Sequence, residues 1–306
     1  MLLYLFYNAD LLDMARGLDE KSLGYVDNIA FMATANSFMQ MHSILKSMML
    51  WAQGGFHWSE AHNSKFETSK SMLMDLSRSK SAIHPPLSIR GMTIATVSTH
   101  KFLGVMLDQE LRWGPQANYM VAKATKWTLT YRRLARPSMG IRPRLMQQLY
   151  NAVAVPKMVY AADVWYTPVY LCTGRERHCG SVGITSRLAS VQCLASTTIM
   201  GALCSTATDV LDLHANLLPV EPMLHKVCQR AAVRLTTLPA SHPLSAPFKT
   251  QAKHFIKTHW SPLHELAFIY DISPSSFETL APARALPRHR NKFTMVPFGT
   301  EEESIE

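Results

Sequence analysis

Apolar and polar residues alternate in several short segments of the first third of the chain. Residues 23–31 alternate around Asp27-Asn28, and this pattern predicts two strands joined by a tight turn, because Asp and Asn favour turns. Residues 87–94 alternate in the same way around Arg90-Gly91, which predicts a second hairpin. Two further strands are predicted at residues 71–76 and 101–107.

Longer segments repeat their apolar residues every three or four positions, and this period predicts amphipathic helices. One helix is expected over residues 36–53, capped by Asn36, and another over about residues 114–136. Pro143 begins a further helical pattern, and more helices are expected within residues 184–240. Together with the short strands, these helices predict an α+β fold.

Composition narrows the class of protein. With 306 residues, 47% hydrophobic and 17% charged, the chain suits a globular protein of one large or two small domains. No apolar run approaches the roughly 20 residues of a membrane helix, and the apolar start lacks the basic residues of a signal peptide. The five cysteines form no Cys-x-x-Cys pair, which favours a reducing compartment over a disulfide framework. We therefore expect an intracellular protein, nuclear or cytoplasmic, without a membrane segment.

Positive charge is concentrated in one block of the chain. The net charge is +9, and the segment from Leu111 to Ala162 contains nine basic residues and no acidic one. In the helix expected over residues 114–136, the basic residues lie outside the apolar stripe; they are Lys123, Lys126, Arg132, Arg133 and Arg136. Three interpretations of this helix compete: a solvated face, a membrane-surface helix and a phosphate-binding helix. The lack of carboxylates and the second helical pattern at Pro143 favour the phosphate-binding helix.

Residues 5–12, 25–28, 66–71 and 100–105 are four short motifs that, in this order, resemble the reverse transcriptases of non-LTR (LINE-like) retrotransposons. Tyr25-Val26-Asp27-Asn28 resembles the Tyr-x-Asp-Asp hairpin of that family, and residues 5–12 resemble the helix that precedes it. Residues 66–71 and 100–105 are similar to the next two palm motifs. The resemblance covers residues 1 to about 240 and implies a small antiparallel palm sheet followed by a helical thumb.

The resemblance also implies a division of the chain. The implied parts are a partial palm (1–110), a basic helical thumb (111–172), a linker (173–183), a helical extension (184–242) and a poorly ordered tail (243–306).

Roles for individual residues follow from the same resemblance. Asp27 is expected to be a catalytic metal ligand, Asn28 a degenerate second position, and Lys70 a proton donor to the leaving pyrophosphate. Phe102, Leu103 and Gly104 are expected to grip the primer end. Simpler interpretations stay open: an ordinary turn at Asp27-Asn28, a solvated lysine at 70, and core packing at Phe102 and Leu103.

Magnesium binding is expected to be weak or absent in this chain. The family holds two Mg²⁺ ions with carboxylates from two palm strands, and the strand with the first aspartate lies upstream of the motif at residues 5–12. An asparagine amide supplies no charge to a hard cation. We therefore expect binding of an RNA or DNA template–primer without polymerisation. A decayed element product, a helical protein-interaction scaffold and a piece of a longer active polymerase are the alternatives.

Overall fold

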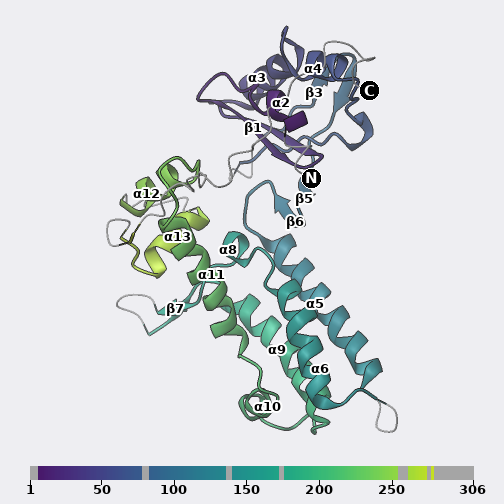
Figure 1. Ribbon diagram of the computed structural model, residues 1–306, viewed down its shortest axis with the longest axis vertical. Coiled ribbons are helices and arrows are strands. Elements are labelled where there is room, and N and C mark those ends of the chain that lie inside the picture. Colours follow the sequence, from purple (N-terminus) through teal and green to yellow (C-terminus); the bar gives the residue numbers. More distant parts are fainter. Residues whose placement is uncertain are drawn as a thin grey trace, which may run out of the picture. The chain divides into compact units, whose positions relative to one another are not determined.

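The computed structural model describes residues 6–77, 83–135, 140–171, 176–253, 261–273 and 277–278. It combines α-helices with small two-stranded antiparallel sheets, so the chain has the mixed α and β class that the sequence predicts. Contacts divide it into two compact units, Met1–Lys123 and Ala124–Glu306 (Figure 1). Each helix in the described ranges is too short or too polar to cross a lipid bilayer.

The first unit contains three hairpins and a few short helices (Figure 1). Its elements are α2 (Ala9–Leu12), β1 (Glu20–Tyr25), β2 (Asn28–Ala33), α3 (Phe38–Leu50), α4 (Gly55–Ala61), a 3₁₀ turn (Thr68–Lys70), β3 (Leu87–Ile89), β4 (Met92–Ile94), β5 (Thr99–Phe102), β6 (Val105–Asp108) and the first half of α5 (Gly114–Leu134).

One face of the β1–β2 hairpin packs on a small apolar core. Ile29 and Phe31 of β2 contact a buried cluster of Leu11, Met14 and Trp58. Helix α2 approaches the hairpin closely at Gly24, where an added Cβ would meet the Leu12 side chain at 2.7 Å. The two strands pair antiparallel around a tight turn, which confirms the predicted hairpin.

A second core lies under the β3–β4 hairpin. Leu73, Leu87 and Ile89 are buried there, with partly buried side chains of α3 and α4 packed against them. The hairpin around Arg90-Gly91 confirms the sequence prediction.

Two strand predictions are wrong. Residues 71–76 form no strand; Leu73 makes a single bridge to Thr96, and Asp75 turns inward to bind His42. Residues 101–107 form two strands instead of one, because the chain reverses at Leu103-Gly104 between β5 and β6. Both turn residues have positive φ, 47° and 87°, as a two-residue hairpin turn requires.

Helix α3 begins later than the sequence indicates. Its N-cap is Ser37, whose Oγ accepts a hydrogen bond from the backbone N–H of Gln40, and not Asn36. Ser37 has the extended backbone that an N-cap residue adopts.

The second unit is mainly helical (Figure 1). Its elements are the second half of α5, α6 (Pro143–Leu149), a π-helical turn (Tyr150–Ala154), α7 (Val155–Met158), α8 (Ala162–Trp165), β7 (Tyr170–Leu171), β8 (His178–Cys179), α9 (Val182–Met200), α10 (Thr208–His214), α11 (Val220–Thr236), α12 (Ser245–Lys253) and α13 (Pro262–Ile269).

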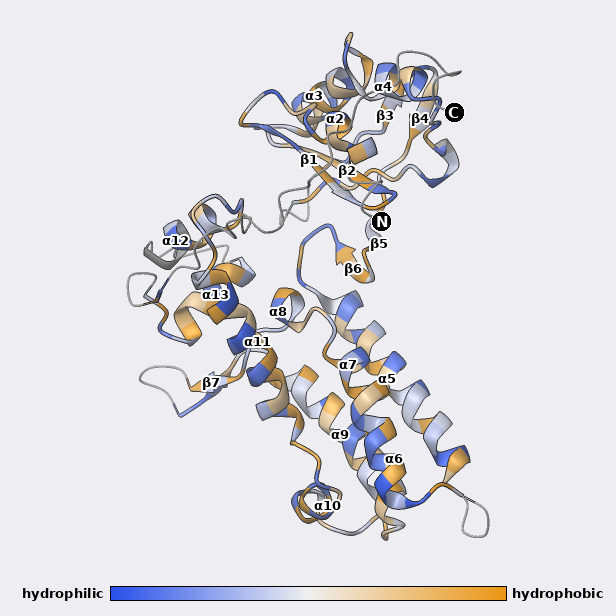
Figure 2. Ribbon diagram, viewed as in Figure 1, coloured by the Kyte–Doolittle hydropathy of each residue, from blue (hydrophilic) through white to orange (hydrophobic). Residues whose placement is uncertain are grey.

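The core of this unit joins α5, α6 and α9. Tyr131, Met146, Tyr150 and Ala195 belong to one buried cluster, and apolar and polar segments alternate along these helices (Figure 2). The π-helical turn precedes Pro156, whose missing N–H cannot bond to a carbonyl one turn earlier.

Two features of the second unit differ from the expectations. The structure contains α12 and α13 in the region expected to be a poorly ordered tail, and Phe248 and Leu266 are buried there. Cys179 takes part in a disulfide, whereas Cys193, Cys204 and Cys228 are free thiols. Cysteine spacing alone did not reveal this bond, because pairing depends on folded proximity.

Candidate nucleic-acid interface

Asp27 lies at the tip of the β1–β2 hairpin. The strands pair Tyr25 with Asn28, so Val26 and Asp27 are the two turn residues instead of Asp27 and Asn28. Val26 has φ 57°, an unfavourable conformation for a β-branched residue. The buried Asn8 side chain donates a 2.8 Å hydrogen bond to the Val26 carbonyl and holds the turn in this conformation.

The Asp27 carboxylate lies beside the side chain of Asn28. It is exposed, and its Oδ1 accepts a 3.2 Å hydrogen bond from the Asn28 side-chain amide. In the residues that the structure describes, no group of three or more His, Cys, Asp or Glu side chains is arranged to hold a metal ion. Paired Mg²⁺ ions need several anionic ligands, and weak or absent Mg²⁺ binding at Asp27 stays a prediction.

Lys70 lies in the segment between α4 and β3. It ends the 3₁₀ turn Thr68–Lys70, where its side chain is exposed and its backbone N–H donates to the Glu67 carbonyl. Among the described residues, no hydrogen bond or ion pair connects Lys70 with Asp27.

Phe102, Leu103 and Gly104 form the tip of the β5–β6 hairpin. Phe102 pairs with Val105 and is half-buried, whereas Leu103 is 40% exposed at the turn. The three residues expected to contact the primer end thus lie together at one tight turn.

Helix α5 holds this hairpin in place through side chains of its first turns. Gln116 is completely buried, and its Oε1 accepts a 2.8 Å hydrogen bond from the Met106 backbone N–H. Phe102 and Val105 form the hydrogen-bonded pair that closes the turn. In the next pair, Lys101 and Met106, the Met106 N–H points away from β5, so its acceptor must come from another element.

The loop between β6 and α5 is fixed by a carboxylate. Asp108 is 9% exposed, and its two oxygens accept 2.9 Å hydrogen bonds from the backbone N–H groups of Arg112 and Trp113. The Arg112 side chain pairs with Glu110. Both carboxylates of this loop are therefore engaged locally.

Two lysines meet at one tyrosine beside the hairpin. Lys101 of β5 donates a 3.1 Å hydrogen bond to the Tyr119 hydroxyl oxygen, and the Lys123 ammonium lies 5.4 Å from the Tyr119 ring centroid. The hydrogen bond from Lys101, and the charges of Lys123 and Lys101, lower the pKa of Tyr119 below its usual value of 10, against a smaller opposing effect of burial.

Sequence reasoning did not single out Lys101 or Tyr119. The spacing of Tyr119 and Lys123, four residues apart on one helix face, was a usable signal. The pairing with Lys101 is a tertiary contact that no local pattern encodes.

The second half of α5 carries Lys126, Arg132 and Arg133 on its surface. All three are exposed and make no ion pair within the described chain. At 3.6 residues per turn, Lys126 and Arg133 share one side of the helix, and Arg132 lies on another. Arg136 lies outside the described residues.

Helix α6 and the chain before it carry further cations. Arg142 and Arg144 are exposed and likewise have no ion-pair partner in the described chain. The Lys157 ammonium lies 3.5 Å from the centroid of the Trp127 ring, so its charge rests on an aromatic face. The described part of the second unit thus carries several exposed cations that have no ion-pair partner there.

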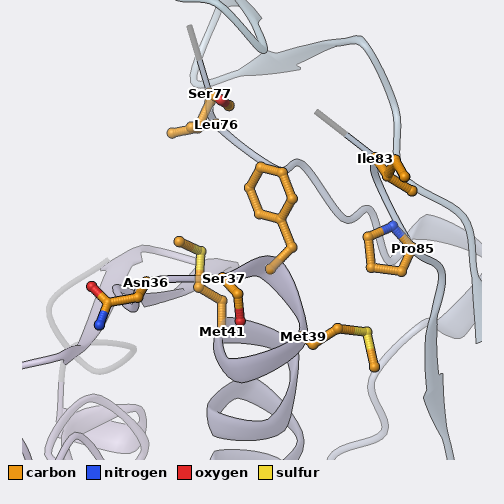
Figure 3. A pocket seen from close by; sticks show the side chains of 9 residues that line it. Asn36, Ser37, Met39, Met41, Leu76, Ser77, Ile83 and Pro85 are labelled. Carbon is orange, nitrogen blue, oxygen red and sulfur yellow. The ribbon is translucent and has the colours of Figure 1, made fainter. Parts of the chain in front are cut away.

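An apolar pocket of about 510 Å³ lies elsewhere, at the start of α3 (Figure 3). Phe38, Met39, Met41, Ile83 and Pro85 contribute to its lining, and no charged residue does. None of the expected catalytic or nucleic-acid-binding residues lines this pocket.

Comparisons of the chain with protein-family models, curated proteins and solved structures found no match. The family resemblance therefore depends on the short sequence motifs alone.

Proposed function

We propose that this chain is part of a reverse transcriptase of the non-LTR retrotransposon type, with palm-like and thumb-like segments that bind nucleic acid. In this proposal the three hairpins of the first unit correspond to a partial palm, and α5 and α6 correspond to a basic thumb. The chain alone does not polymerise, and Mg²⁺ binding at Asp27 is weak or absent.

The observation that carries the proposal is the uncompensated charge of the α5–α6 region. Exposed Lys126, Arg132, Arg133, Arg142 and Arg144 have no ion-pair partner in the described chain, and the segment from Leu111 to Ala162 contains no acidic residue. An ordinary solvated face mixes charges of both signs. Cations attract a polyanion, and duplex DNA carries one negative charge per about 1.7 Å of its axis.

A helical scaffold that binds proteins is the second candidate. Exposed leucines around α10 favour it, since Leu203 is 76% and Leu213 78% exposed. This candidate does not use the basic surface of α5, so charge neutralisation there distinguishes the two functions.

The test is the salt dependence of RNA and DNA binding, measured by fluorescence anisotropy with the full chain. Replacing Lys126, Arg132 and Arg133 by Gln should weaken binding and reduce the slope of log K against log salt by about 2 to 3, since each phosphate contact contributes about 0.7 to 0.9.

The matched control replaces three exposed lysines of the first unit by Gln, namely Lys21, Lys46 and Lys65. It changes the net charge by the same amount, and we expect a smaller change in the slope. Equal effects of the two triple variants would contradict an interface on α5. Absence of any salt-dependent binding by the wild-type chain would refute the proposed function and favour the scaffold.

A further inference from the structure

Two positive charges and one hydroxyl converge beside the β5–β6 hairpin. Lys101 uses one N–H for the Tyr119 oxygen, which leaves two donors on its ammonium, and the Lys123 ammonium keeps three. The Tyr119 hydroxyl accepts that bond, so its own hydrogen stays available to a ligand.

No carboxylate competes for these cations in the described chain. Neither lysine has an ion-pair partner there, and only Lys101 and Lys123 contribute charges to the pKa shift of Tyr119. The nearest acidic residues along the chain, Asp108 and Glu110, bind the backbone of Arg112 and Trp113 and the side chain of Arg112.

The count of charges and donors matches one kind of phosphate group. A phosphate monoester carries a charge of about −1.5 to −2 at pH 7 and three free oxygens, whereas each phosphodiester of a strand carries a single negative charge. Two ammonium groups and one hydroxyl neutralise the monoester and offer one donor to each of its oxygens. A diester would leave one cation and one donor unused.

We propose that Lys101, Tyr119 and Lys123 bind the terminal phosphate of a nucleic-acid strand. This inference rests on the proposed nucleic-acid binding and specifies a strand end, with a phosphate monoester, as the ligand of this site. Helix α5 and the β5–β6 hairpin fix the three groups relative to one another through the Gln116–Met106 hydrogen bond.

The experiment compares one single-stranded oligonucleotide with a 5′-phosphate, a 3′-phosphate or hydroxyls at both ends. Wild-type chain should bind one phosphorylated form about tenfold more tightly than the hydroxyl form at 150 mM salt, the expected gain from a charge-assisted contact. Lys101→Gln, Lys123→Gln and Tyr119→Phe should each reduce this preference. Lys101→Arg should retain it, and circular dichroism should show that each variant is folded.

Lys126→Gln is the matched control on the same helix. It should weaken binding of all three oligonucleotides equally and leave the preference for a terminal phosphate unchanged. Free phosphate is the other ligand with the same chemistry. Its binding is measured by calorimetric titration with inorganic phosphate at constant ionic strength.

The pH dependence separates a ligand contact from a structural role. The preference for the phosphorylated over the hydroxyl-ended oligonucleotide should rise as the pH increases through about 6, because the monoester then gains its second negative charge. It should fall on the alkaline side as Tyr119 loses its proton, at a pH below the usual phenol pKa because the neighbouring lysines lower that pKa. In Tyr119→Phe this alkaline decrease should be absent.

Three results would overturn this inference alone. The first is equal binding of phosphorylated and hydroxyl-ended strands by the wild-type chain, with salt dependence intact, which leaves the proposed function standing. The second is a preference that persists in both glutamine variants. The third is tight binding of inorganic phosphate without any preference among strands, which would make free phosphate the ligand. Absence of all nucleic-acid binding would refute this site together with the proposed function.

Discussion

A buried histidine and aspartate connect α3 to the segment that follows the 3₁₀ turn. The Asp75 carboxylate is 4% exposed; its Oδ1 lies 2.8 Å from His42 Nε2, and its Oδ2 lies 3.5 Å from His84 Nδ1. A buried carboxylate that loses its partner keeps the cost of desolvation without the compensating bond.

Replacing His42 by Ala should therefore lower the free energy of unfolding by about 3 kcal/mol, measured by chemical denaturation. The control, His57→Ala on the exposed surface of α4, should change it by less than about 0.5 kcal/mol. Adding Asp75→Ala to His42→Ala should cost less than the sum of the two single changes, since the carboxylate is then gone. Additive losses would contradict the pairing.

The second residue-scale prediction concerns Asn28. Asn28→Asp restores the second carboxylate of the Tyr-x-Asp-Asp pattern, but it replaces the amide that donates to Asp27 and puts two like charges side by side. We expect no templated synthesis in a primer-extension assay with Mg²⁺, because two carboxylates on one turn do not complete a two-metal site. Synthesis by the variant, or by the wild-type chain, would show that further ligands converge there.

At the scale of elements, the β5–β6 hairpin depends on α5 for its position. Strands of four residues are marginal alone, and Gln116 supplies an acceptor for an outward-facing backbone N–H.

Gln116→Leu replaces the amide by an apolar side chain of similar size and removes this acceptor. Amide exchange at Met106 should become faster by about tenfold, corresponding to a loss of about 1.4 kcal/mol of local protection, as measured by NMR. Gln148→Leu, at an exposed position of α6, should leave the Met106 exchange rate unchanged. Unchanged exchange in Gln116→Leu would mean that the hairpin is held by other contacts.

The elements with strong periodicity were predictable from the sequence. Helix α5 ends at Leu134, close to the expected end, and α6 begins at Pro143 as expected. Their apolar stripes contain enough positions to define a face. The short strands were less predictable, since residues 101–107 contain a turn whose positive φ values only the folded hairpin requires.

At the scale of the second unit, α12 and α13 cover part of α11. Phe248 is completely buried, Leu266 is 2% exposed, and Tyr270 donates a hydrogen bond to the backbone of His225. Burial also raises the pKa of the Cys228 thiol on α11 to about 12. A region rich in Pro, Ser and His thus contributes to the packing of this unit.

Deleting residues 244–306 should uncover Cys228. As burial is lost, its pKa should fall toward the usual thiol value, so the thiolate fraction at pH 8 rises and alkylation by iodoacetamide becomes faster. Mass spectrometry of the labelled chain measures this rate, with the exposed Cys204 as the internal reference. An unchanged Cys228 rate would indicate that α12 and α13 do not protect it.

The sequence by itself determined the mixed helical and strand composition, the hairpins around residues 27 and 90, and the basic character of α5. These features depend on local periodicity, turn chemistry and charge, which neighbouring residues carry along the chain. The resemblance to reverse transcriptases also comes from the sequence alone and stays a proposal.

Only the tertiary structure decided which distant groups meet. It paired His42 with Asp75, placed Lys101 against Tyr119, and buried Phe248 in a segment whose composition predicts disorder. It also left Asp27 at an exposed tip with one neighbouring amide. Long-range contacts depend on how elements pack, and packing is a property of the whole fold that no local pattern specifies.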